Sequence, residues 1–156
     1  MNRLDIEQFV LESWAIEGLV PTPIRLLDLA AFHCQFLPQD RIELEDMVRA
    51  AQEFAQAPLR DKPGMDVRVG SHMPPRGGPD IAIELCRILE YAHKSPDKAH
   101  FIHCGYETIH PFMDGNGRTG RLLWAWCMNR SGIDPAWLKR GFLHTWYYQS
   151  LQESRP

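Results

Sequence analysis

An uninterrupted apolar run, Leu122 to Met128, is separated by four residues from a Gly-Asn-Gly turn at residues 115–117. A helix that is apolar on every side has to be covered on every side, so other elements must pack around it. We predict that this helix begins near Gly117, continues to about Arg130, and ends at Ser131-Gly132.

The turn itself has the composition of an anion-binding site. It lies within the stretch His110-Pro-Phe-Met-Asp-Gly-Asn-Gly-Arg-Thr-Gly-Arg121. Glycines on both sides of Asn116 allow the backbone to come close to a ligand. The unpaired N–H groups at a helix start, together with the positive end of the helix dipole, attract phosphate.

Each charged side chain of this stretch suits a step in phosphate chemistry. Asp114 offers the carboxylate oxygen that Mg²⁺ prefers. Arg118 and Arg121 are three positions apart on the first helical turns, so their guanidinium groups can bind separate phosphate groups. The imidazole of His110 can accept a proton from an attacking hydroxyl. The pattern therefore predicts a nucleotide site for in-line attack at phosphorus.

Two other interpretations of the same residues are possible. Asp-Gly and Asn-Gly often mark simple turns, and arginines on helices are usually solvated. A zinc site could use four nearby ligands, which are His100, His103, Cys104 and His110. No paired set of ligands follows them further along the chain.

Composition limits the remaining possibilities. With 156 residues, 44% apolar and 24% charged, the chain suits one domain with a sizeable core. A net charge of −3 gives no basic surface for nucleic acid. Charges near the N-terminus and the lack of a run of about 20 apolar residues argue against a signal peptide or membrane span, so we expect a cytoplasmic protein. The four cysteines are widely spaced and are expected to be reduced.

Apolar periodicity predicts further helices over residues 4–17, 24–36, 40–57, 80–93, 96–109 and 135–147, hence an all-α helical bundle. Asp40 and Ser95 are candidate N-caps for two of them. A segment rich in Pro and Gly separates Pro58 from Pro79, and only Val67-Arg68-Val69 alternates within it like a strand.

This irregular segment is either an ordered crossover or a binding loop. Its short apolar edge, completed by His72 and Met73, could receive an extended peptide by strand addition.

Another unusual residue is Glu17, which continues an apolar stripe at the C-terminal end of the first predicted helix. The helix dipole disfavours negative charge there, so this carboxylate needs a cationic partner unless it lies in a frayed, solvated last turn.

The stretch His110–Arg121 resembles the signature of the Fic family, H-x-F-x-D-G-N-G-R-x-x-R, with every defined position filled. The likeness extends over about residues 22–150. It implies a Fic-type helical bundle with a β-hairpin flap insertion that docks the target: Val67, Arg68, Val69, Gly70, His72 and Met73.

By this resemblance, the activity is transfer of AMP from Mg·ATP to a Ser, Thr or Tyr hydroxyl of a target protein, which could be the chain itself. His110 would be the base and Asp114 the metal ligand. Gly115, Asn116 and Gly117 would form the anion hole, and Arg118 and Arg121 would bind the β and γ phosphates. Gly117 in place of lysine distinguishes the chain from the Doc-like branch, which phosphorylates its target.

The segment Ser13-Trp-Ala-Ile-Glu17-Gly18 resembles the inhibitory motif of the family, [S/T]-x-x-x-E-[G/N]. The resemblance implies that residues 1–20 form an inhibitory helix and residues 21–156 the catalytic domain, within one compact unit. Glu17 would form a salt bridge with Arg121 and prevent productive binding of the γ-phosphate.

Three functions remain open at this point. The first is an autoinhibited AMP-transferase, and the second is a hydrolase that removes AMP with the same site. The third is a nucleotide-binding toxin–antitoxin module without catalysis. Exposed aromatic residues near the C-terminus suggest a homodimer face: Trp146, Tyr147 and Tyr148.

Overall fold

The computed structural model describes residues 3–133, 150, 151 and 153. Its helices are α1 (Arg3–Ile16), α2 (Pro23–Phe36), α3 (Leu44–Ala55), α4 (Pro79–Lys94), the short 3₁₀ helix η1 (Pro96–Lys98), α5 (Ala99–Ile109) and α6 (Asn116–Arg130). The predicted all-α fold is confirmed. The helix expected over 135–147 and the aromatic residues of the suggested dimer face lie outside the described residues. No helix in the described part of the chain is both long and apolar enough to cross a membrane.

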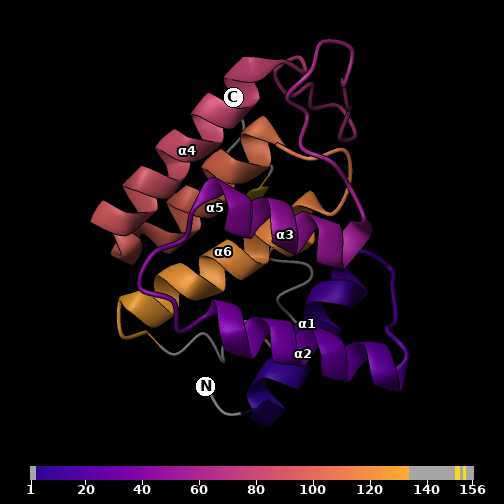
Figure 1. The fold of residues 1–156 in the computed structure, drawn as a ribbon, viewed down its shortest axis with the longest axis vertical. Coiled ribbons are helices and arrows are strands. Elements are labelled where there is room, and N and C mark those ends of the chain that lie inside the picture. Colours follow the sequence, from indigo (N-terminus) through magenta and orange to yellow (C-terminus); the bar gives the residue numbers. More distant parts are fainter. Residues whose placement is uncertain (1–2, 134–149, 152, 154–156) are drawn as a thin grey trace.

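Helix α6 forms the centre of the bundle, as its sequence requires. Every residue from Leu122 to Met128 is buried. Figure 1 shows α6 lying between the pair α4 and α5 on one side and the pair α1 and α2 on the other. Because α6 cannot shift without opening the core, its N-terminal end is held in a fixed position.

Helix α1 belongs to the same core. Its buried side chains, which pack with those of α2 and α6, are Ile6, Phe9, Val10, Trp14 and Ile16. The chain then turns at Gly18, which adopts the left-handed conformation with φ of 70°. This turn leaves Glu17 just beyond the last helical residue, and thus on the side that faces α6.

Two of the expected helix starts are wrong. Helix α3 begins at Leu44, four residues beyond Asp40, because Glu43 and Asp46 form a reciprocal capping box that satisfies the first amides. Asp40 instead accepts a bond from Arg130 at 2.8 Å. Ser95 makes no side-chain cap, and a 3₁₀ turn precedes α5.

Two buried histidines make the fold sensitive to acid. Burial lowers the pKa of His33 and of His103 to about 4 in each case. Unfolded histidine titrates near 6.5, so between these values the unfolded chain binds protons that the folded chain does not. Stability should therefore fall as the pH drops from 7 to 4, by about 2 kcal/mol for each histidine at pH 5. Urea unfolding at pH 7.5 and pH 5.0 measures this, and equal midpoints would contradict it.

Candidate functional site

The loop between α5 and α6 is held by its own side chains. His110 follows the last residue of α5 in the left-handed conformation, with φ of 48°, and Gly115 precedes α6 with φ of 76°. Phe112 is fully buried between them. The side-chain amide of Asn116 accepts a bond from the Phe112 N–H and donates one to its carbonyl, both at 2.8 Å. Asn116 therefore braces the loop with its side chain, and any contribution to anion binding comes from its backbone.

The carboxylate of Glu17 lies over the N-terminal end of α6. A Cβ atom built on Gly117 would lie only 2.3 Å from Glu17 Oε1. The same oxygen accepts a bond from Arg121 Nη2 at 2.6 Å. Only glycine at position 117 leaves room for this approach. The chain thus places one of its own anions where the sequence predicts a phosphate site.

Ser13 holds the same guanidinium group. Arg121 donates from Nε to Ser13 Oγ at 2.9 Å and from Nη2 to the Ser13 carbonyl at 2.8 Å. With the bond to Glu17, α1 and the residue just after it provide three acceptors for one arginine, which is 1% exposed. The structure therefore brings Arg121 into contact with Ser13 and Glu17, which are more than a hundred positions away from it in the sequence.

Arg118 is also covered. It donates to the Phe54 carbonyl at 2.6 Å, and its guanidinium carbon lies 5.2 Å from the centre of the Trp14 ring. Burial lowers the pKa of Arg118, while nearby Asp114 and Glu17 act in the opposite direction. The two arginines are thus both buried against protein, which differs from the alternative in which arginines on a helix are solvated.

Asp114 is an exposed residue of the loop, with 73% of its side chain accessible. Its Oδ1 accepts the Gly115 N–H at 2.6 Å and lies 3.6 Å from Arg118 Nη2. One accessible carboxylate at a phosphate site fits Mg²⁺, which commonly binds through one or two carboxylates, phosphate oxygens and water. Asp114 is therefore a suitable ligand for such an ion.

Zinc coordination gains no support from the described residues, among which no group of three or more His, Cys, Asp or Glu side chains is placed to hold a metal ion. Instead, His103 stacks on Trp124 with ring centres 5.0 Å apart, and His100 contacts the same ring edge-on at 5.3 Å. These two histidines serve in packing against α6.

The expected flap contains a single antiparallel bridge in the described structure, between Val69 and His72. Gly70 turns the chain there with φ of 59°. Pro74 and Pro75 follow Met73. Because proline has no backbone N–H, it cannot donate the hydrogen bonds that would extend the pairing of the two strands. A longer hairpin is therefore absent from the described residues.

Individual flap side chains differ in their surroundings. His72 contacts the Thr108 carbonyl at 2.9 Å through Nε2, so its ring docks on the end of α5. Arg68 is exposed and donates to Gly70 O within the turn, Val67 is partly buried, and Met73 is 66% exposed. Met73 is thus the most open apolar side chain for a docking partner on this segment.

Arg60 ties the segment around the flap to the loop between α5 and α6, and it was not identified from sequence. Its guanidinium group is fully buried and donates to four carbonyls. Two of these belong to Ile109 and His110, at 2.7 Å each, and two to Met65 and Pro75, which lie on either side of the flap, at 3.0 Å each. A single arginine in a Pro-rich loop carries no sequence signal of burial, because most arginines are exposed.

Replacing Arg60 with methionine should destabilise the protein by about 3 kcal/mol or more, because several buried carbonyls lose their donor. Arg68→Met is the matched control, since Arg68 is exposed and bonds only within the turn. Chemical unfolding of both variants tests this. Equal stabilities for the two would show that the Arg60 bonds contribute little.

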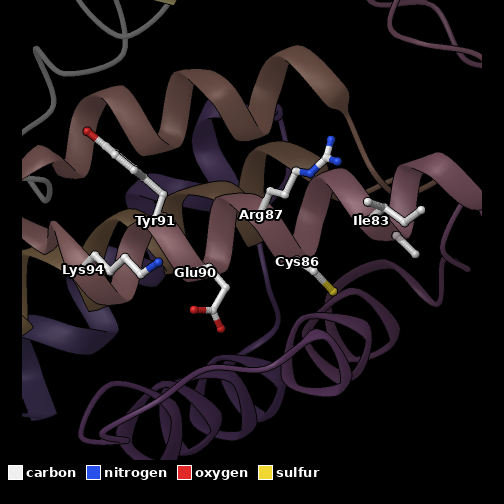
Figure 2. Close-up of a pocket in the computed structure, with 7 residues that line it drawn as sticks. Ile83, Cys86, Arg87, Glu90, Tyr91 and Lys94 are labelled. Carbon is white, nitrogen blue, oxygen red and sulfur yellow. The ribbon is translucent and has the colours of Figure 1, made fainter.

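A separate cavity of about 620 Å³ lies along the outer side of α4 (Figure 2). Its lining residues all belong to that helix: Ala82, Ile83, Cys86, Arg87, Glu90, Tyr91 and Lys94. None of them is part of the loop from His110 to Arg121. The cavity is therefore distinct from the candidate site.

Comparison with known proteins identifies similar chains. Protein adenylyltransferase Fic from Culex quinquefasciatus is 36% identical over 93 residues, which is 55% of this chain and 18% of that protein. The protein of the same name from Drosophila virilis is 42% identical over 76 residues, covering 44% of this chain and 16% of the relative. The chain thus spans less than a fifth of the length of these relatives.

A solved structure of Fic-1 from C. elegans has a similar fold, with a TM-score of 0.60 and 23% identity. The match covers 97% of this chain and 57% of that one. The model of the Fic/DOC family matches residues 35–128, from the end of α2 through most of α6. Since this match includes the whole loop and more than half of the sequence, the chain belongs to the Fic/DOC family.

Proposed function

We propose that this chain transfers AMP from ATP to a hydroxyl group of a protein. The observation that carries the proposal is the anion site at the start of α6, where the Glu17 carboxylate lies between Gly117 and Arg121. A site that attracts a carboxylate in this manner suits a phosphate group. Membership of the family and the names of the relatives support the same activity.

The proposed reaction is a substitution at the α-phosphorus of ATP. The oxygen of a Ser, Thr or Tyr side chain attacks phosphorus, and His110 accepts the proton that this hydroxyl loses. The bond from the α-phosphorus to the bridging oxygen breaks, so pyrophosphate leaves and a phosphodiester forms. Arg118, Arg121 and the amides of Gly115, Asn116 and Gly117 would stabilise the charge on the phosphates.

Magnesium is the metal that we propose for this site. Asp114 would hold it, because its carboxylate is exposed at the lip of the loop. When bound, Mg²⁺ neutralises phosphate charge.

We also place the reaction in the cytoplasm, which is supported by the four free cysteines: Cys34, Cys86, Cys104 and Cys127.

We further propose that Glu17 inhibits the transfer. Its carboxylate binds the same guanidinium group that the γ-phosphate would bind, and it lies over the same helix start. ATP would have to displace this contact to orient its phosphates correctly. The inhibitory helix expected over residues 1–20 would then act through its last turn.

Mass spectrometry tests the function. The wild type and Glu17→Gly are incubated separately with Mg·ATP and with a lysate, and AMP adducts are sought on the chain and on lysate proteins. An adduct that increases in Glu17→Gly supports the transferase. Loss of an adduct already present points to the reverse hydrolysis. ATP protection against unfolding without either change would identify a binding module and overturn the proposal.

A further inference from the structure

Glu107 is a buried carboxylate one helical turn before the proposed base. It lies on α5, is 3% exposed, and its Oε2 is 3.5 Å from His110 Nδ1. This distance is long for a hydrogen bond. Contacts in catalytic sites are often long before substrate binds and shorten in the reacting complex.

Helix α6 leaves room for the other carboxylate oxygen of Glu107, Oε1. A Cβ atom built on Gly120 of α6 would lie 2.6 Å from Glu107 Oε1 and 3.0 Å from His103 Cε1. In the described part of the chain, Oε1 has no hydrogen-bond partner. A carboxylate buried with so few bonds is unfavourable for stability alone. The position of this carboxylate beside His110 therefore points to a role in the site.

The charges around Glu107 keep it ionised. Burial alone would raise the pKa of Glu107, but its partner His110 and the guanidinium group of Arg121 are among the groups that outweigh this effect and hold the pKa below its usual value. His103, on the same helix, is neutral at pH 7 because burial lowers its pKa to about 4. Arg121 comes from α6. The groups that face the carboxylate are thus one neutral ring, one guanidinium group and the His110 imidazole.

We propose that Glu107 is a positioning residue for His110. Its carboxylate accepts a hydrogen bond from the Nδ1–H of the imidazole. This leaves Nε2 as the nitrogen that can take a proton from the attacking hydroxyl. Arg60 holds the backbone of His110 through its carbonyl, so the ring and the main chain are fixed by different residues. This inference rests on the proposed function, in which His110 is the base.

The tautomer of His110 can be observed without any activity. In the wild type, ¹⁵N-labelled histidine spectra at pH 8 should show a proton on Nδ1 of His110, identified by the signal that His110→Ala removes. Glu107→Gln, which keeps the size of the side chain, should shift the ring towards the Nε2–H form. A wild-type ring that is protonated on Nε2 would overturn the proposal, whether or not the variant folds.

Kinetics provide the second measurement. In a Glu17→Gly background, Glu107→Gln should lower the rate of AMP transfer at least about tenfold, with little change in KM for ATP. An unchanged rate in an active background would refute the inference alone. A background that transfers no AMP would refute the proposed function, and the tautomer measurement would still decide the role of Glu107.

Discussion

His110→Ala, in the Glu17→Gly background, should lower the rate of AMP transfer by about 10²–10⁴-fold. The imidazole of His110 is suited to accept a proton from a hydroxyl, and the backbone that carries it is fixed on both sides. The His110 carbonyl accepts a bond from Arg60, and the buried Phe112 anchors the chain two residues later. Initial rates with a hydroxyl-bearing target and labelled Mg·ATP measure the effect.

The control for His110→Ala must show that the loop still binds nucleotide. Protection of the fold by Mg·ATP, measured as a shift in unfolding temperature, should be similar in both proteins because the anion site does not use the imidazole. His100→Ala is a matched histidine variant, since His100 packs on Trp124 away from the loop. A His110→Ala protein that retains its full rate would exclude the imidazole as the base.

Glu17→Gly should raise the rate of transfer by about tenfold to a hundredfold. The charge-assisted bond to Arg121 contributes about 1.5–3 kcal/mol, and each 1.4 kcal/mol corresponds to a factor of ten. Glycine costs little at this position, because residue 17 lies beyond the last helical residue of α1. Val20→Gly controls for the glycine itself, since Val20 also lies beyond the last residue of α1 and is 87% exposed.

A second variant, at Ser13, should add to the effect of Glu17→Gly. Arg121 keeps two bonds to Ser13 when Glu17 is removed, one to the hydroxyl and one to the carbonyl. Adding Ser13→Ala removes the first of these and should raise the rate further. If Glu17→Gly and wild type transfer AMP at the same rate while both remain folded, Glu17 is not an inhibitor.

Much of the fold could be predicted because local signals determine it. The apolar run after the Gly-Asn-Gly turn required a buried helix, and α6 is that helix. Gly18 marked the end of α1. The start of α3 was missed because Glu43 and Asp46 cap it together, a signal as good as Asp40 but closer to the helix. Propensities cannot choose between neighbouring caps of similar strength.

The supporting residues of the site could not be predicted. Arg60 and Glu107 are charged residues with almost no exposure, against the general tendency of their types. Their partners become neighbours only after the bundle has formed: Arg60 reaches His110 from fifty positions away. Glu107 needs Gly120 on the facing helix to make space. Sequence patterns identified the groups that we propose to bind a ligand, whereas the groups that hold them depend on tertiary packing.

Trp14 has a consequence for how the site would open. This residue is part of the hydrophobic core, yet its ring also covers the guanidinium group of Arg118, while Ser13 next to it holds Arg121. Freeing the two arginines therefore requires the last turn of α1 to give up core packing. Under the proposed function, nucleotide binding and the docking of α1 oppose each other by the same free energy in both directions. A partner that pulls on α1 would thus act as an activator, and ATP would in turn make α1 easier to detach.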